Sequence, residues 1–193
     1  DLVRSRGLGD VYKRQDFLWL VNAGVGLMVP QVTEARSPLK RTEKAAAFKL
    51  YESDTGMLAS RYPGSTARAV YLDMKTPNLG GLYENVVAQE LVALGADTWY
   101  YQTREVGEVD FVIEGHVVPI EVKSGKKVRA HAALDRLMSV GEYKIPEAVV
   151  LSHENLSEEG KILYVPIYMT FCLDEFMEKD DPNNDFSFAP ISL

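Results

Sequence analysis

The chain has 193 residues, of which 46% are hydrophobic and 25% are charged, and its formal net charge at pH 7 is −7. This length allows one or two small domains, and the net charge argues against a protein coated with basic side chains for nucleic acid, although a local basic groove remains compatible with it. The longest apolar stretch, residues 17–29, is too short for a membrane span, and a single cysteine excludes an internal disulfide. With no recognisable secretory signal, a cytoplasmic protein without a membrane partner is expected.

The N-terminal residues 1–15 differ in character from the rest of the chain. The run from Gly9 to Gln15 looks like translated sequencing adapter, a known contaminant of metagenomic reading frames. A non-native leader is therefore expected over residues 1–15, and it is excluded from the reasoning about the fold.

Residues 16–66 have the pattern of a winged helix with its wing. A helix capped by Asp16 precedes a strand at 25–32, where Pro30 suggests a sheet edge. A polar loop at 33–44 leads to a second strand at 46–51, and a short helix follows from Asp54. The loop carries basic residues that are read either as DNA contacts or as part of a solvated linker: Arg36, Lys40 and Arg41.

A turn-rich boundary at 62–65 separates this segment from a second unit at 67–175. Its first helix is predicted over 82–94, and Glu84 shares one face of that helix with Val87, Ala88 and Leu91. Glu84 either faces an internal site or is favoured in the first turn by the helix dipole. The aromatic-rich strand that follows at 97–103 is expected to belong to the core.

The next two strands are predicted to form a hairpin at 108–113 and 116–123, with Glu114-Gly115 as a two-residue turn because glycine accepts a positive φ. In that register Asp110 lies opposite Pro119. The alternation of side chains then places Asp110, Glu121 and Lys123 on one side of the sheet. Asp110 and Glu121 are diagonal neighbours, roughly 7–8 Å apart at Cα.

Two carboxylates and a lysine in this arrangement suit one chemistry well. Mg²⁺ prefers hard oxygen ligands and often takes only one or two protein carboxylates. A metal ion lowers the pKa of bound water and polarises a phosphoryl oxygen, and Lys123 is placed to orient the water or to offset charge on the phosphate. Asp110, Glu121 and Lys123 are therefore a candidate site for phosphodiester hydrolysis that depends on Mg²⁺ or Mn²⁺.

The remaining pattern completes an α/β (α+β) arrangement in the order α-β-β-β-α-β, with a mixed sheet and flanking helices. A helix is predicted over 126–140, and its basic first turn, with Lys126, Lys127 and Arg129, hints at binding of a polyanion such as DNA. Strands are expected at 147–152 and 161–165, a helix or strand at 166–178, and a flexible acidic tail at 176–193.

The residues Asp110 and Glu121-Val122-Lys123, separated by ten positions, resemble the motif of the PD-(D/E)XK nuclease superfamily. The wider runs at 80–91, 108–111 and 119–125 are similar to a domain of unknown function at the C-terminus of many bacterial and archaeal AAA-type ATPases. The resemblance implies a restriction-endonuclease-like fold, Glu84 as a further acid of the site and an ATPase domain N-terminal to this segment. This chain has no P-loop, so no ATP site is expected within it.

Two principal hypotheses follow. In the first, Asp110, Glu121 and the Val122 carbonyl hold the metal of a DNA nuclease, and Lys123 and Glu84 act beside it. In the second, the fold is a catalytically silent nucleic-acid-binding or regulatory module of the ATPase, and Lys123 pairs with Glu121 or Asp110. A chance E-x-K triplet in an unrelated α/β fold is the third alternative.

Overall fold

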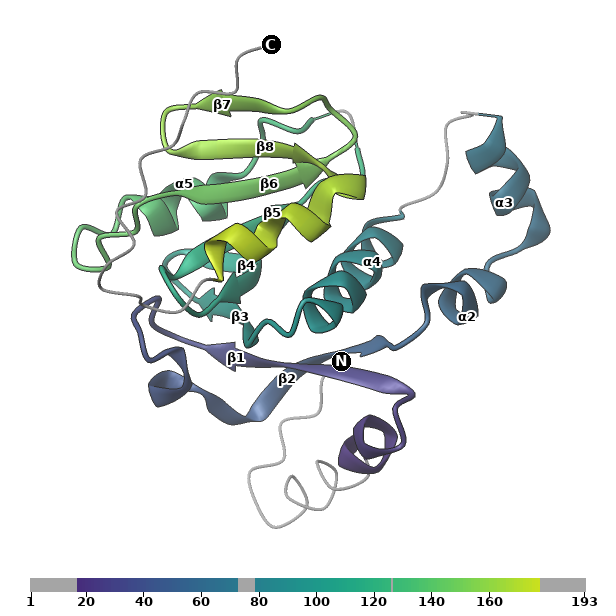
Figure 1. Ribbon diagram of the computed structural model, residues 1–193, viewed down its shortest axis with the longest axis horizontal. Coiled ribbons are helices and arrows are strands. Elements are labelled where there is room, and N and C mark those ends of the chain that lie inside the picture. Colours follow the sequence, from purple (N-terminus) through teal and green to yellow (C-terminus); the bar gives the residue numbers. More distant parts are fainter. Residues whose placement is uncertain (1–16, 73–78, 126, 178–193) are drawn as a thin grey trace.

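The computed structural model describes residues 17–72, 79–125 and 127–177. The predicted leader, the Asp16 cap, Lys126 and most of the predicted tail lie outside these residues. One eight-stranded mixed sheet, in the order β2-β1-β3-β4-β5-β6-β8-β7, organises the described chain (Figure 1).

The sequence forms short strands and few long helices. A helical turn at 17–22 comes first. The strands are β1 Gly26–Val32, β2 Lys44–Glu52, β3 Thr98–Thr103, β4 Gly107–Ile113, β5 Val118–Val122, β6 Ala148–Ser152, β7 Ser157–Glu159 and β8 Ile162–Pro166. The α-helices are α2 Thr55–Ser60, α3 Gly64–Tyr71, α4 Gly80–Ala93 and α5 Ala132–Met138, and the 3₁₀ helices are η1 Leu39–Thr42 and η2 Ile167–Phe176.

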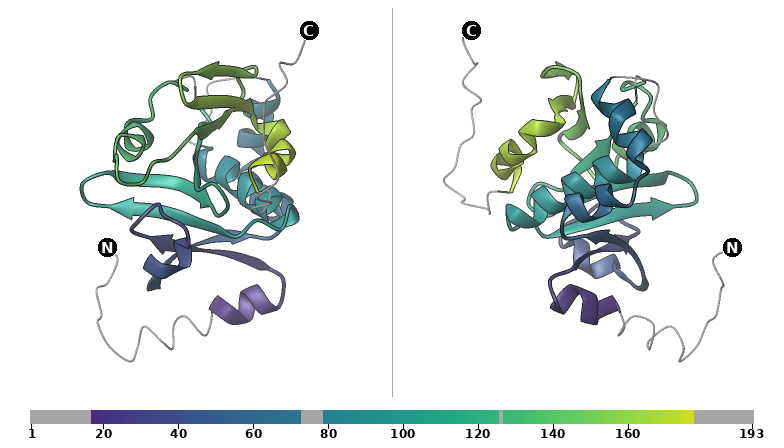
Figure 2. Two further views of the ribbon diagram at one scale, coloured as in Figure 1. Left: turned by 60° about the vertical axis from the view of Figure 1, so that its left-hand side comes forward. Right: turned by 90° about the vertical axis from the view of Figure 1, so that its right-hand side faces the viewer.

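Helices cover the two faces of the sheet and create two separate cores (Figure 2). On one face, Leu134 and Leu137 of α5 pack with Val109 and Val112 of β4. On the other face, α4 and η2 pack against side chains such as Phe111. Among the described residues, no helix is long and apolar enough to cross a membrane.

The predicted core order is confirmed. The elements follow one another as α4, β3, β4, β5, α5 and β6. β3, β4 and β5 pair antiparallel, whereas β5, β6 and β8 pair parallel, so the sheet is mixed. The aromatic side chains of β3 are buried as expected, with Tyr101 only 1% exposed.

The N-terminal strands form where the sequence predicts them, but they do not stand apart as a winged-helix unit. β1 pairs antiparallel with β2 and parallel with β3 through Gln31 and Val32, so both strands extend the main sheet. The prediction that Pro30 marks an edge strand is wrong: β2 is the edge, and Pro30 lies where the β1–β2 register shifts. An irregularity of this kind tolerates the missing N–H of proline.

The predicted basic first turn of the helix at 126–140 is also wrong. α5 begins at Ala132, after a turn in which the Ala130 N–H donates to the Lys127 carbonyl. Basic side chains are disfavoured at a helix N-terminus, and this segment forms a turn in which Val128 is buried. Lys127 and Arg129 therefore lie in a loop after β5, and no helix dipole acts on them.

Candidate functional site

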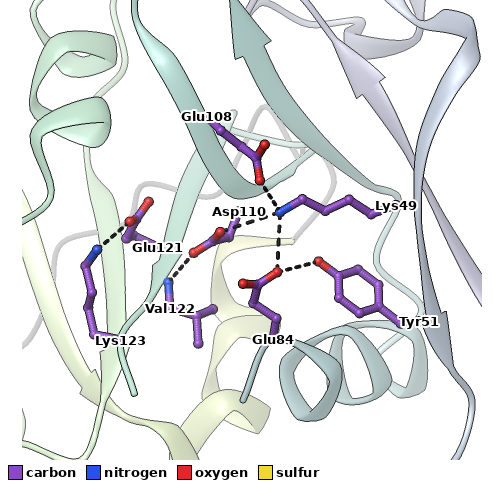
Figure 3. Close-up of polar contacts among 8 residues, drawn as sticks. All are labelled: Lys49, Tyr51, Glu84, Glu108, Asp110, Glu121, Val122 and Lys123. Carbon is purple, nitrogen blue, oxygen red and sulfur yellow. Dashed lines mark hydrogen bonds and ion pairs between the residues drawn. The ribbon is translucent and has the colours of Figure 1, made fainter. Parts of the chain in front are cut away.

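The three predicted acidic residues, Glu84, Asp110 and Glu121, lie together at the end of β4 and β5 where the two strands part (Figure 3). A fourth acid that the sequence did not single out, Glu108, joins them. Glu108 and Asp110 come from β4, Glu121 comes from β5, and Glu84 comes from the second turn of α4. Of the two alternatives for Glu84, the structure supports the one in which it faces inward, since its carboxylate contacts Lys49 and Tyr51.

The hairpin register differs from the prediction by two residues. Ile113 pairs with Val118 and Phe111 with Ile120, so the loop has four residues, 114–117. Gly115 has φ 93° and Val117 has φ 55°, which closes the longer turn. The paired residues end at Phe111 and Ile120, so Asp110 and Glu121 lie just beyond the ladder and are not the diagonal pair that the sequence predicted.

A β-bulge in β4 places Asp110. Val109 pairs with Tyr101 and Val112 with Trp99, so Asp110 and Phe111 together oppose a single residue of β3. The extra residue interrupts the alternation: Val109 and Val112 pack in the α5-side core, whereas Phe111 packs in the α4-side core. Bulges commonly re-aim a side chain next to a functional site, and here the bulge brings Asp110 toward Glu84 and Lys49.

Asp110 and Glu121 therefore approach each other from different faces of the sheet. Glu121 pairs with Val150, a residue of the α5-side core, while its neighbour Ile120 belongs to the α4-side core. The prediction that Asp110, Glu121 and Lys123 share one face of a regular sheet is thus replaced by an arrangement across the gap between β4 and β5.

Asp110 is held across that gap by a backbone group. Its Oδ2 accepts a hydrogen bond of 2.8 Å from the Val122 N–H, beyond the last paired residues of the two strands. Burial raises the pKa of Asp110, and the charges of Glu121 and Glu84 raise it further. Lys49 and the Val122 N–H lower it in part, so the pKa lies at about 7. Asp110 is therefore poised to change its charge near neutral pH.

Glu121 and Lys123 form a short pair, with Lys123 Nζ 2.7 Å from Glu121 Oε1. The other carboxylate oxygen of Glu121, Oε2, is buried without a hydrogen-bond partner, and the residue is 8% exposed. An unsatisfied buried carboxylate oxygen is costly. Glu52 Oε2 and Glu114 Oε1 are also buried without a partner, but Glu121 Oε2 belongs to a residue whose charge acts on a second buried carboxylate, that of Asp110.

Lys49 of β2 lies among the other carboxylates. Its Nζ is 2.7 Å from Glu108 Oε1, 3.4 Å from Glu84 Oε2 and 3.5 Å from Asp110 Oδ1. Burial lowers the pKa of Lys49, but Asp110, Glu108 and Glu84 together outweigh burial and leave the pKa above its usual value. Lys49 therefore carries a positive charge in this site.

Tyr51 and Asn85 fix β2 against α4. The Tyr51 hydroxyl donates to Glu84 Oε2 at 3.0 Å, and its ring lies against Phe111. The Asn85 side chain accepts from the Glu52 N–H at 2.8 Å and donates to the Glu52 carbonyl at 2.9 Å, as a neighbouring strand would. Asn85 is 1% exposed, so this contact sets the position of Lys49 relative to Glu84.

The sequence reasoning missed Lys49 and Tyr51 because it assigned them to a wing strand of a separate segment. A signal was present: a lysine and a tyrosine, two positions apart, share one face of a strand that is apolar from Ala45 to Phe48. That spacing puts both side chains on the face of β2 that turns toward α4.

The basic candidates fall into two groups at opposite ends of the β4–β5 hairpin. Lys127 and Arg129 follow β5, at the same end as the acidic site. The loop with Arg36, Lys40 and Arg41 lies at the turn end, where the Leu39 N–H donates to Glu114. Arg36 pairs with Glu142 and Arg41 pairs with Glu34, both at 2.7 Å.

The arrangement brings the carboxylates of Asp110 and Glu121 together as oxygen ligands for a hard cation, and the Val122 carbonyl stays a predicted third ligand. Within the described ranges, no three carboxylate, imidazole or thiolate side chains are gathered as a ready metal site, so a cation here would rely on few protein ligands. Mg²⁺ fits that donor set because it keeps several of its waters. The unpartnered Glu121 oxygen beside Asp110 is the feature that such a cation would satisfy.

Comparison with known proteins gives one family match. Searches of curated proteins and of solved structures found no match. Residues 79–169 match the family model described as a domain of unknown function (DUF4143). The matched region runs from α4 into η2 and includes Glu84, Asp110, Glu121 and Lys123, whereas Lys49 lies outside it. This part of the chain is thus similar to a domain family whose function is not defined.

Proposed function

We propose that this chain carries a metal-dependent phosphodiester hydrolysis site of the PD-(D/E)XK nuclease type, acting on DNA. The observation that carries the proposal is the buried, unpartnered Oε2 of Glu121 beside Asp110. Repulsion between these two carboxylates is part of what raises the pKa of Asp110. A cation held between them would give Glu121 Oε2 a partner and would offset the repulsion between the two carboxylates.

The charge of the whole site supports a divalent ion. Four carboxylates (Glu84, Glu108, Asp110 and Glu121) face two ammonium groups (Lys49 and Lys123), which leaves a formal charge of −2 when all are ionised. Partly buried charges need a counter-charge because water screens them weakly. Mg²⁺ or Mn²⁺ supplies that charge and accepts the carboxylate and carbonyl oxygens present here.

Each residue then has a definite role. Asp110, Glu121 and the Val122 carbonyl would hold the ion, which when bound supplies an activated water and polarises the phosphate. Lys123 is positioned beside Glu121 to orient that water or to offset negative charge on the phosphate. Glu84 is anchored by Tyr51 and Lys49 and would hold an outer water of the site.

The wider context of the proposal comes from the sequence resemblance. The runs at 80–91 and 119–125 are similar to the C-terminal domain of AAA-type ATPases, and the core order α4-β3-β4-β5-α5-β6 agrees with a restriction-endonuclease-like fold. On this basis the chain would act as the nuclease-like part of an ATP-binding protein, with the ATPase domain preceding it in the full-length protein.

A second candidate function is a silent binding or regulatory module. The observation that favours it is the ion pairing already present: Lys123 lies 2.7 Å from Glu121, and Lys49 contacts three other acids. In this case the lysines serve as structural counter-charges and no metal is required.

Cleavage of single-stranded, duplex and branched DNA with Mg²⁺, with Mn²⁺ and with EDTA separates the two functions. The nuclease proposal expects cleavage that EDTA abolishes and that falls at least about 100-fold in Asp110→Ala and in Lys123→Ala, because each removes a transition-state contact worth several kcal/mol. The matched controls are Glu158→Ala on β7 and Lys44→Ala on β2, which lie away from the cluster and should cleave like the wild type. Cleavage that persists in Asp110→Ala would rule out this site as its source.

DNA binding should depend on the basic residues nearest the site. Replacing Lys127 and Arg129 by alanine is expected to reduce the slope of log K against log salt by about 2, since each lost phosphate contact removes about 0.9. Replacing Arg36 and Arg41 should change the slope less, because they lie at the opposite end of the hairpin from the acidic site. Pairing does not distinguish the two groups, since Arg129 is also paired, with Glu159 at 3.4 Å. The measurement is fluorescence anisotropy of labelled DNA over a salt series. If only the replacement of Arg36 and Arg41 alters the slope, DNA contacts the loop at 33–44 and not the residues after β5.

A further inference from the structure

Lys49 occupies the centre of three carboxylates. Glu84, Glu108 and Asp110 each place an oxygen within 3.5 Å of its Nζ, and the lysine side chain is 19% exposed (Figure 3). The three acids come from α4 and β4, whereas Lys49 comes from β2. Only the tertiary fold brings this cation to this position.

The surroundings hold the Lys49 ammonium in place. Its Nζ lies 5.3 Å from the centre of the Tyr100 ring, which attracts a cation. β2 is tied to α4 through the two Asn85 hydrogen bonds, and Tyr51 shares Glu84 Oε2 with the lysine. An ammonium fixed by backbone pairing and by side-chain packing is not readily displaced by an ion from solution.

Glu121 lies on the opposite side of Asp110 from Lys49 (Figure 3). Glu121 Oε2 is buried without a partner, while Oε1 of the same residue is paired with Lys123. Asp110 therefore separates two cation positions. One is filled by Lys49, and the other is bordered by an oxygen that still lacks a partner.

We infer that Lys49 is a built-in cation that neutralises Glu84, Glu108 and Asp110 in place of a second metal ion, so that the site takes a single metal ion, on the Glu121 side. This inference rests on the proposed function for the ion at Asp110 and Glu121. It assigns to Lys49 the charge compensation that a second metal ion supplies in two-metal hydrolytic sites. It also makes β2, which lies outside the matched family region, a part of the site.

Removal of the ammonium should open the second position. Lys49→Met keeps the length of the side chain and deletes its charge, which leaves Glu84, Glu108 and Asp110 uncompensated. Isothermal titration with Mn²⁺ is expected to show one more ion bound per chain than in the wild type. Lys49→Arg, which keeps the charge, and Lys44→Met, which deletes an exposed lysine of the same strand, are expected to bind the wild-type number.

The outcomes separate this inference from the proposed function. One ion in the wild type and two in Lys49→Met support both. No ion in the wild type and one in Lys49→Met support the role of Lys49 and overturn the metal-dependent function. Two ions in the wild type, or an equal number in both proteins, overturn the inference while leaving the function open to the cleavage assay.

The inference can still be tested if Lys49→Met fails to fold. Glu108→Gln relieves one negative charge and leaves Glu84 and Asp110 as ligands, which is enough for Mn²⁺. Lys49→Met/Glu108→Gln is then compared with Glu108→Gln alone by the same titration. The double variant must still bind one ion more, and equal binding contradicts the role of Lys49.

Discussion

Asp110→Asn is expected to remove a pH dependence from the stability of the metal-free protein. The pKa of Asp110 lies at about 7 in the folded state, mainly because of burial and the charges of Glu121 and Glu84, against about 3.9 in an unfolded chain. Between these two values the folded state binds the proton and the unfolded state does not. The contribution of Asp110 to the free energy of unfolding therefore falls as the pH rises through this window.

The measurement is urea unfolding of wild type and variant in EDTA between about pH 4 and about pH 8. The variant should gain stability relative to the wild type over this range, by up to about 4 kcal/mol if the whole shift is expressed. The control is Asp97→Asn, which changes an exposed carboxylate outside the cluster. Its free energy of unfolding should differ from that of the wild type by less than about 0.5 kcal/mol over the same pH range. If the stability difference between Asp110→Asn and the wild type does not change with pH, Asp110 is not a buried carboxyl group repelled by neighbouring carboxylates.

Phe111→Ala is expected to destabilise the protein by about 3–5 kcal/mol, since it removes a fully buried ring and leaves a cavity. Phe111 is the residue that the β4 bulge turns into the α4-side core, where its ring lies 5.6 Å from that of Tyr51. The loss of this contact should also loosen Tyr51 and Lys49 next to Asp110.

The matched control is Phe171→Ala, the same substitution at a side chain that is 57% exposed, which should cost less than about 0.5 kcal/mol. Urea denaturation of both variants gives the two changes in the free energy of unfolding, when the free energies are fitted with one common slope against urea concentration. Similar costs at both positions would refute the assignment of Phe111 to the core.

Much of the fold could be predicted from local patterns. The strands and α4 are continuous segments of the chain, and an inward position of Glu84 could be expected because helical spacing sets it on a face with Val87, Ala88 and Leu91. The two-residue error in the hairpin register left each β5 side chain on its face, because side chains alternate with a period of two. The start of α5 at Ala132 was harder to predict, since the residues before it have an apolar pattern compatible with a helix but form a turn.

The sequence by itself determined that Asp110, Glu121 and Lys123 come from one hairpin, because residues so close in the chain meet through local pairing. Only the tertiary structure decided what surrounds them. The bulge at Asp110 depends on pairing with β3, and Lys49 reaches Glu84 across 35 positions because β1 joins the sheet beside β3. Contacts of this kind arise from packing between distant segments, and no local periodicity encodes them.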